Sequence, residues 1–254
     1  MKTVTIERKG GVAVLRLSRE HGNAINEAMV EDLLQACKNL RGDPEVCGIL
    51  LASTGKLFCP GLDLRDLVLL DRRSMDRFMV RFREMLVSLY TLPRPVVASI
   101  SGAAMAGGCV LALTADWRIL KRGAPIGLNE VKVGVPLPLS VTALLMDAVS
   151  PRALAEVALL GNNFEGDAAL AAGLAHELHE GEGIEQAAMA RLAEFMSKDA
   201  ASFSATKAHL RAPTATRMKS ENPSNRKEWI DCWFSKETRR RIERIVAGLK
   251  TRSA

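Results

Sequence analysis

The chain has 254 residues, of which 48% are hydrophobic and 25% are charged, and its formal net charge is +6. These values predict one compact globular domain with a small appendage. No stretch approaches the ~20 uninterrupted apolar residues of a membrane span, and the N-terminal segment lacks the apolar run of a signal peptide, so we expect neither. The positive charge suits an anionic ligand, but it does not separate nucleic acid from a polyphosphate cofactor.

The first two thirds of the chain alternate β-branched runs with longer helical patterns. Strands are expected at residues 3–7, 12–17, 48–52, 96–100 and 117–121, and helices at residues 27–40, 66–90 and 107–115. The first two strands are separated by a Gly-Gly turn and are expected to form a hairpin. Strand–helix–strand alternation predicts an α/β fold with a mostly parallel sheet and crossover helices.

Beyond Asn129 the strand signal fades and helical patterns follow one another. Helices are expected at residues 139–149, 152–160, 165–172, 184–196 and, after a Pro- and Asn-bearing break at residues 211–225, at about 227–249. The last one carries an apolar stripe that must dock on its own core or on another subunit. We therefore divide the chain into a core, residues 1–195, and a C-terminal helical region, residues 196–254.

The five cysteines are odd in number, scattered, and lack metal-ligand spacing with each other or with a histidine. We expect no metal site, reduced thiols and a cytoplasmic location. The four histidines share no local pattern with a Ser or Cys nucleophile, so we interpret them as surface or packing residues. These histidines are His21, His176, His179 and His209.

Two glycine-bearing loops share one plan, in which a strand leads into a turn and the turn into a helix. Residues 55–64 read Gly-Lys-Leu-Phe-Cys-Pro-Gly-Leu-Asp-Leu, and residues 101–109 read Ser-Gly-Ala-Ala-Met-Ala-Gly-Gly-Cys. Helix N-termini present unpaired N–H groups and the positive end of a dipole. If the two loops converge, their N–H groups form an oxyanion hole, which stabilises charge developing on a carbonyl oxygen.

Both loops resemble signatures of the crotonase (enoyl-CoA hydratase/isomerase) superfamily, in the family's order and at its separation. Residues 23–26, Asn-Ala-Ile-Asn, resemble its upstream Asn-Ala-Leu-Asn element. The three motifs lie within residues 1–135, and the helical remainder fits the family's trimerisation region. The resemblance implies a crotonase-like spiral of ββα repeats that assembles as a homotrimer or a dimer of trimers.

The resemblance also assigns roles to residues of this chain. The oxyanion donors are expected to be the main-chain N–H groups of Leu62 and Gly107. Pro60 stands where the family commonly has Ala, and this change is expected to spare the hole because the matching donor is Leu62. The acyl-CoA substrate is expected to contact the main chain and nearby side chains of a further set, with coenzyme A entering only as part of the thioester and no permanent cofactor. This set is Ala24, Asn26, Lys56, Pro60, Gly61, Asp63 and Leu64, in which Asp63 is expected to fix the turn.

The acidic residues at two motif positions determine which reaction is expected. Hydratases of the superfamily carry two glutamates; Val110 stands at the first position here, and Glu130 matches the second. The stretch Gly-Leu-Asn-Glu and both loops look most like mitochondrial-type Δ3,Δ2-enoyl-CoA isomerases of fatty acid metabolism. A 1,3-allylic shift needs one base, whereas water addition asks for two positioned groups. Partial desolvation beside Val110 is expected to raise the pKa of Glu130 toward the range of a general base.

Other interpretations stay open. Loss of the first acid is also compatible with a catalytically degenerate acyl-CoA-binding homologue, and the superfamily hosts hydration and other reactions on one oxyanion hole. Arginine clusters at residues 72–83 and 239–244 suggest an RNA-binding surface. That interpretation is the weaker one, because glutamates interrupt the clusters and no stacking aromatics are interleaved.

Overall fold

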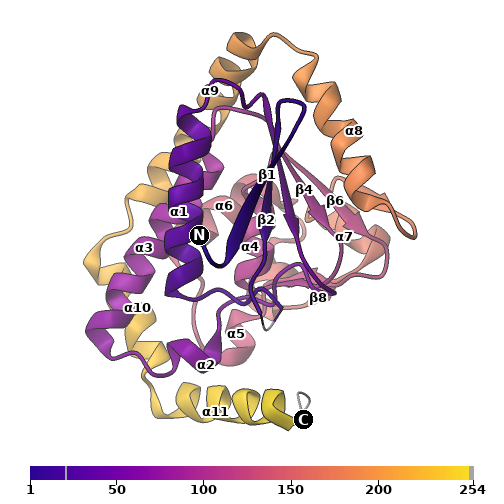
Figure 1. The fold of residues 1–254 in the computed structure, drawn as a ribbon. Coiled ribbons are helices and arrows are strands. Elements are labelled where there is room, and N and C mark those ends of the chain that lie inside the picture. Colours follow the sequence, from indigo (N-terminus) through magenta and orange to yellow (C-terminus); the bar gives the residue numbers. More distant parts are fainter. Residues whose placement is uncertain (21, 252–254) are drawn as a thin grey trace.

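The computed structural model describes residues 1–20 and 22–251, and a six-stranded mixed sheet lies at its centre (Figure 1). Only the first two strands pair antiparallel, as the predicted hairpin requires; every other neighbouring pair is parallel. In spatial order the strands are β1 (Val4–Lys9), β2 (Val12–Leu17), β3 (Gly48–Ser53), β4 (Val96–Ile100), β6 (Trp117–Lys121) and β9 (Glu177–His179).

A second, three-stranded sheet is built from two-residue strands that the sequence patterns did not reveal. They are β5 (Ala104–Met105), β7 (Ile126–Gly127) and β8 (Asn163–Phe164). β5 runs parallel to β7, and β7 runs antiparallel to β8. Two residues are too few to show an alternation of apolar and polar side chains, so only tertiary pairing defines these strands.

Helices cover both faces of the large sheet. α8 packs on β3, β4 and β6, while α1 and α3 pack on each other and α9 packs on α3 and α6. Alternate residues of one strand serve the two faces: Leu50 belongs to the α8 side and Leu51 to the main core. The helices are α1 (Glu27–Gly42), α2 (Leu64–Leu67), α3 (Arg72–Tyr90), α4 (Gly107–Leu113), α5 (Glu130–Val133), α6 (Leu139–Ala148), η1 (Ala155–Leu160), α7 (Gly166–Ala172), α8 (Ile184–Met196), α9 (Ala200–Lys219), α10 (Pro223–Trp233) and α11 (Lys236–Thr251).

The single long helix predicted at residues 66–90 is wrong, because two helices with a break between them occupy this stretch. Asp63 caps the N-terminus of α2 by accepting from the N–H of Arg65, and Asp71 caps α3 by accepting from the N–H of Ser74. An aspartate at an N-cap satisfies helix N–H groups that otherwise have no partner. Each cap starts a new helix, although the charged and apolar pattern runs on through the break.

The C-terminal region also differs from its prediction. Helix α9 continues through Pro213 to Lys219, inside the stretch expected to be a break. Pro213 is exposed, so the carbonyl that its missing N–H leaves unbonded lies on the solvent side. The last predicted helix is in fact α10 and α11, and α10 begins with a capping box between Asn222 and Asn225. The predicted division, between residues 195 and 196, falls one residue before the end of α8, and it stays a prediction.

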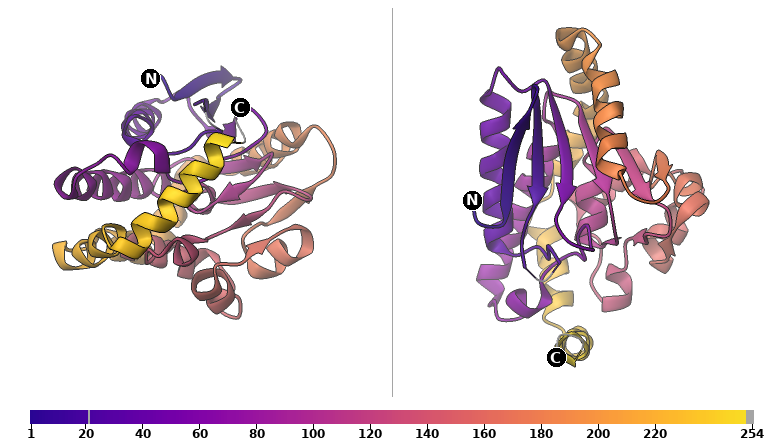
Figure 2. Two further views of the ribbon diagram at one scale, coloured as in Figure 1. Left: turned by 90° about the horizontal axis from the view of Figure 1, so that it is seen from below. Right: turned by 45° about the vertical axis from the view of Figure 1, so that its right-hand side comes forward.

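Helix α11 lies across one end of the molecule, next to α2 and α5 (Figure 1). Seen from below, it crosses this end diagonally (Figure 2). Its most deeply buried apolar side chain is Ile242, and its Thr238 is only 3% exposed. Within the part of the chain that the structure describes, no helix is long and apolar enough to cross a membrane.

Candidate active site

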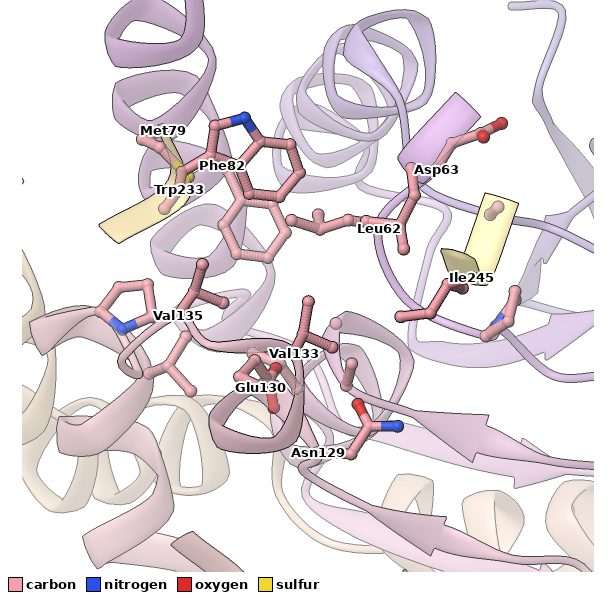
Figure 3. A pocket seen from close by; sticks show the side chains of 18 of the residues that line it. Leu62, Asp63, Met79, Phe82, Asn129, Glu130, Val133, Val135, Trp233 and Ile245 are labelled. Carbon is pink, nitrogen blue, oxygen red and sulfur yellow. The ribbon is translucent and has the colours of Figure 1, made fainter. Parts of the chain in front are cut away.

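An apolar cavity of about 420 Å³ lies at the end of the molecule covered by α11 (Figure 3). Its lining combines the two glycine loops with side chains from α3, α5, α10 and α11. Asp63 and Glu130 are the carboxylates among its lining residues. The far wall is apolar and aromatic, and it is formed by Met79, Phe82, Val135, Pro138, Val141, Trp229 and Trp233.

The two glycine loops lie directly against each other. The N–H groups of Phe58 and Cys59 both donate to the carbonyl of Ala103 at 3.1 Å, and the N–H of Met105 donates to the carbonyl of Cys59 at 2.9 Å. A Cβ at Gly108 would lie 2.0 Å from that same carbonyl oxygen. Only glycine permits this approach. The convergence expected from the sequence is therefore present in the fold.

Pairing with one neighbouring residue orients the Leu62 N–H. Ile25 donates to the carbonyl of Gly61 at 2.8 Å and accepts from the N–H of Asp63 at 2.7 Å. In such a parallel bridge, the residue between the two partners turns its own N–H the other way. No residue that the structure describes accepts a hydrogen bond from the Leu62 N–H, which leaves it available on the cavity side.

The Gly107 N–H belongs to the first residue of α4, so it has no acceptor within the helix. The residue before it, Ala106, has φ +49° and ψ −123°, a conformation that L-residues rarely adopt. Strained backbone of this kind persists where surrounding contacts enforce it, and it is concentrated at functional sites. A Cβ at Gly61 would lie 3.3 Å from the Gly107 nitrogen, so this N–H and that of Leu62 belong to adjoining stretches of backbone.

Glu130 is the first residue of α5 and lies across the cavity from Leu62 (Figure 3). Burial raises the pKa of its carboxyl group to about 7. Its Oε2 atom is buried and has no hydrogen-bond partner among the described residues. Val110, at the position of the missing acid, is 1% exposed and also lines the cavity. The cavity therefore contains one carboxylate, that of Glu130, with a raised pKa and apolar surroundings.

The other carboxylate of the cavity is already engaged. Oδ2 of Asp63 accepts from Nη1 of Arg19 at 2.7 Å, and its Oδ1 accepts from the N–H of Arg65 at 3.0 Å. The Asp63 oxygens point away from Glu130 (Figure 3). Asp63 is thus a helix cap and an ion-pair partner, and its carboxylate is not directed at the space between the two N–H groups and Glu130.

The remaining site residues expected from the sequence divide into two groups. Ala24, Pro60 and Leu64 line the cavity. Asn26 does not line it: Oδ1 of Asn26 caps α1 by accepting from the N–H of Met29 at 3.1 Å, and its Nδ2 donates to Asp66. Lys56 is exposed on its loop and is not part of the cavity wall.

Asn23 begins the upstream motif of residues 23–26, but that motif did not indicate what the Asn23 side chain does. It is fully buried and has φ +67°. Its Nδ2 donates to the carbonyl of Thr54 at 2.9 Å and is 3.3 Å from the carbonyls of Leu57 and Phe58, while its Oδ1 accepts from the N–H of Arg19. One side chain thereby fixes the first glycine loop. The sequence feature that could have indicated this role is Gly22-Asn23, because asparagine tolerates a left-handed backbone conformation.

The far wall of the cavity also had no sequence signal. Trp229 and Trp233 are one helical turn apart on α10 and stack with ring centroids 5.3 Å apart. Phe82 and Met79 approach from α3 (Figure 3). These residues come from helices far apart in the chain, and a helix of unknown docking does not reveal which of its apolar residues will face a ligand. The wall suits an apolar group, although the indole N–H of Trp233 has no hydrogen-bond partner among the described residues.

The cysteines and the histidine placed beside the core offer no competing catalytic group. Burial raises the pKa of the Cys59 thiol to about 12 and also raises that of Cys109, so both stay protonated. His176 stacks on Trp117 with centroids 4.5 Å apart, and burial lowers its pKa to about 4. His21 lies outside the described residues.

Comparisons with known proteins agree with this geometry. The profile of the enoyl-CoA hydratase/isomerase family matches residues 7–248. A protein of Thermus thermophilus provisionally named as an enoyl-CoA hydratase is 35% identical over 197 residues, which cover 76% of this chain and 77% of that protein. Human mitochondrial enoyl-CoA delta isomerase 1 is 26% identical over 243 residues, which cover 94% of this chain and 80% of that protein.

The fold comparison covers almost the whole chain. The crystal structure of human mitochondrial Δ3-Δ2-enoyl-CoA isomerase superposes with a TM-score of 0.93 at 25% identity, over 99% of this chain and 100% of that one. The α/β fold is therefore the crotonase fold, as the sequence motifs predicted. With a family profile spanning nearly all of its residues, the chain belongs to the enoyl-CoA hydratase/isomerase family.

Proposed function

We propose that this protein is a Δ3,Δ2-enoyl-CoA isomerase that moves the double bond of a 3-enoyl-CoA to the 2-position. One observation carries the proposal. Glu130 has a pKa of about 7 and an unpartnered carboxylate oxygen, and it lies in an apolar cavity beside two unbonded backbone N–H groups. This combination suits a reaction with one proton carrier and one developing oxyanion.

In this mechanism the thioester carbonyl oxygen accepts hydrogen bonds from the N–H groups of Leu62 and Gly107. Negative charge gathers on that oxygen when the C2 proton leaves, and the fixed donors stabilise it without rearranging. The strained backbone at Ala106 keeps the second donor directed at the cavity. Donors of this kind lower the barrier because they bind the enolate more strongly than the ground-state carbonyl.

Glu130 acts as both base and acid. Its carboxylate removes a proton from C2, the C2–H electron pair forms the enolate, and the same proton then returns to C4. As the C4–H bond forms, the double bond shifts from C3–C4 to C2–C3, so atoms and charge balance. A pKa of about 7 lets one group perform both transfers near neutral pH.

Water addition is the second candidate, because the 35% identical Thermus thermophilus relative carries a hydratase name. Val110 argues against it, since a methyl-bearing side chain at that position cannot orient or deprotonate water. The identity and fold match to the human isomerase support the isomerase assignment. Crotonyl-CoA hydration, assayed beside 3-enoyl-CoA isomerisation, distinguishes the two.

The substrate would be an acyl-CoA whose chain lies on the wall of Met79, Phe82 and Trp233. Coenzyme A enters as part of the thioester, held by main chain near Ala24 and Leu64, and Lys56 faces its phosphates from the exposed loop. No permanent cofactor is proposed. Assembly as a homotrimer or a dimer of trimers completes the proposal.

No observation favours the RNA-binding alternative. Arg72 pairs with Asp231 at 2.7 Å, and Arg81 pairs with Glu31 at 2.6 Å. Paired arginines on a helix surface are typical of a solvated face, and exposed pairs of this kind contribute little energy.

The decisive experiment is the Glu130→Gln variant, assayed for isomerisation of a 3-enoyl-CoA. The substitution preserves size and removes the base, so turnover should fall by the ~10²–10⁴-fold attributed to positioned acid–base groups. Affinity for a saturated acyl-CoA should change little, since main chain does the holding.

A variant that retains more than about a tenth of normal turnover would eliminate Glu130 as the base. A large loss of acyl-CoA affinity would instead assign Glu130 to the shape of the pocket and favour the degenerate binding homologue. Loss of turnover with unchanged binding marks an interaction used in the transition state.

A further inference from the structure

Helix α5, which carries Glu130, does not fix its own position. It has four residues, all of them at least partly exposed, and no side-chain N-cap at Asn129. A single helical turn is unstable by itself, because forming it fixes the backbone dihedrals of several residues and gains very few hydrogen bonds. The place of the Glu130 carboxylate therefore depends on contacts that α5 receives from other elements.

One such contact comes from α11, about a hundred residues further along the chain. The hydroxyl of Thr238 donates to the carbonyl of Gly134 at 3.0 Å. Gly134 ends α5 with φ +104° and donates its own N–H to the carbonyl of Glu130 at 3.0 Å; the N–H of Val135 donates to that same carbonyl at 3.2 Å. Thr238 is thus two hydrogen bonds away from the main chain of Glu130.

The fit between Thr238 and Gly134 is close. A Cβ at Gly134 would lie 2.7 Å from the Thr238 hydroxyl oxygen, so the glycine admits the threonine. Thr238 is 3% exposed, and its N–H is capped by the hydroxyl of Ser235 at 3.2 Å. The Thr238 hydroxyl is therefore buried against the chain end of α5, with the Gly134 carbonyl as its acceptor.

The same helix also contacts the oxyanion side of the cavity. Nη2 of Arg239 donates to the carbonyl of Val68 at 2.9 Å, and Nη2 of Arg65 donates to the carbonyl of Leu249 at 3.2 Å. Val68 and Arg65 belong to α2 and its C-cap, which directly follow the donor Leu62. Helix α11 therefore joins the segment that bears an oxyanion donor to the segment that bears the base.

We propose that Thr238 is a positioning residue for Glu130: from α11 it holds the end of α5, so that the carboxylate stays at a working distance from the N–H groups of Leu62 and Gly107. The inference rests on the proposed role of Glu130 as the base. It adds a residue that touches neither substrate nor reacting atoms, and it gives the C-terminal helix a part in proton transfer.

The test compares Thr238→Val with Thr238→Ser. Valine keeps the branched shape and loses the hydroxyl, whereas serine keeps the hydroxyl. Loss of one buried hydrogen bond that aligns the base should lower kcat about 5–10-fold in Thr238→Val, with KM changed less than twofold. The pH midpoint of kcat should also move in the valine variant. The serine variant should have the kcat and the pH midpoint of the unmodified protein. Glu243→Gln, on the exposed face of α11, is the matched control and should behave as the unmodified protein.

A double-mutant cycle identifies the route of the effect. If Thr238 acts through Glu130, adding Thr238→Val to Glu130→Gln should lower the residual turnover no further. An equal loss in both backgrounds, or a valine variant with normal kcat and an unmoved pH midpoint, would overturn the inference. A valine variant that fails to fold is replaced by Thr238→Ala at lower temperature, judged against serine by the same criteria.

Exchange of the C2 hydrogens of butyryl-CoA with deuterated water separates this inference from the proposed function. Exchange requires only the base and the oxyanion donors, so it does not depend on isomerisation. Exchange that persists in a protein without isomerase activity, and that slows in Thr238→Val, would reject the function and keep the positioning role. Exchange that is absent, or unchanged in Thr238→Val, would reject the positioning role.

Discussion

The two halves of the proposed catalytic site are built in different ways. The oxyanion side consists of two loops that interlock through backbone contacts, with Gly108 seated against the carbonyl of Cys59. The base side is one helical turn, α5, whose residues are all at least partly exposed. The first half is held by backbone contacts between the two loops and by the Asn23 side chain, whereas the second depends on helix α11, far along the chain. Fixed donors stabilise developing charge without rearranging.

Substitution of Gly108 by alanine should lower both turnover and stability, because it separates the two interlocked loops. The new Cβ would lie 2.0 Å from the Cys59 carbonyl, so the loops must separate. Loss of an oxyanion donor costs about 10²–10³-fold in kcat, and displacement of the loops should also lower the melting temperature. Isomerase assays and thermal melts followed by circular dichroism measure the two effects.

Gly42→Ala provides the control for this experiment. A Cβ at Gly42 would meet no atom within 4 Å, and the residue ends helix α1, so the variant should keep both activity and stability. Normal turnover in Gly108→Ala would show that the loops are not interlocked, and the contrast between the two halves of the site would disappear.

This contrast also explains what the sequence revealed. The glycine loops, Leu62, Gly107 and Glu130 were all indicated by local motifs, and five of the six strands of the large sheet were found to within a few residues; the three-residue strand β9 was missed. Local chemistry sets these features: a tight turn demands glycine, and a doubly covered parallel strand demands a continuous apolar run. Such requirements appear as short patterns at fixed positions in the chain.

The features that the sequence did not reveal depend on contacts between distant segments. The aromatic wall at Phe82 and Trp233, the buried Asn23 and the Thr238 contact each join elements that lie far apart in sequence. The break at Asp71 was missed for a different reason, since an N-cap aspartate resembles any charged residue in an amphipathic helix. Helix docking is decided by packing, which no periodicity encodes.

The pH dependence of turnover should sharpen the description of the base side. Only ionised Glu130 can take the C2 proton, and its pKa of about 7 in the free protein should appear in kcat/KM. Activity should be constant well above this value and fall about tenfold per pH unit well below it, about 50-fold between pH 7 and pH 5. Rates measured across pH 5–9 with one 3-enoyl-CoA provide the profile.

Glu130→Gln is the control for the pH profile, and its residual rate should not change in this window. A midpoint near pH 4.5 in the unmodified protein would mean that the carboxylate is well solvated. The base side would then resemble an ordinary surface acid, and the assignment of Glu130 as a desolvated base would fail.

The smallest expected effect is on stability, and it tests burial of Glu130 without any substrate. Its pKa is raised from 4.5 unfolded to about 7 folded, so the folded state binds the proton more tightly. Ionisation therefore destabilises the fold: the penalty is absent below about pH 4.5, grows as pH rises, and is complete above about pH 7. Glu130→Gln carries no such charge, so it should be more stable than the unmodified protein by about 1–3 kcal/mol at pH 8, with no gain at pH 4. Urea unfolding at both pH values measures the difference. Equal stability at pH 8 would show that water reaches the carboxylate, and a larger gain at pH 4 than at pH 8 would reverse the sign on which the base assignment depends.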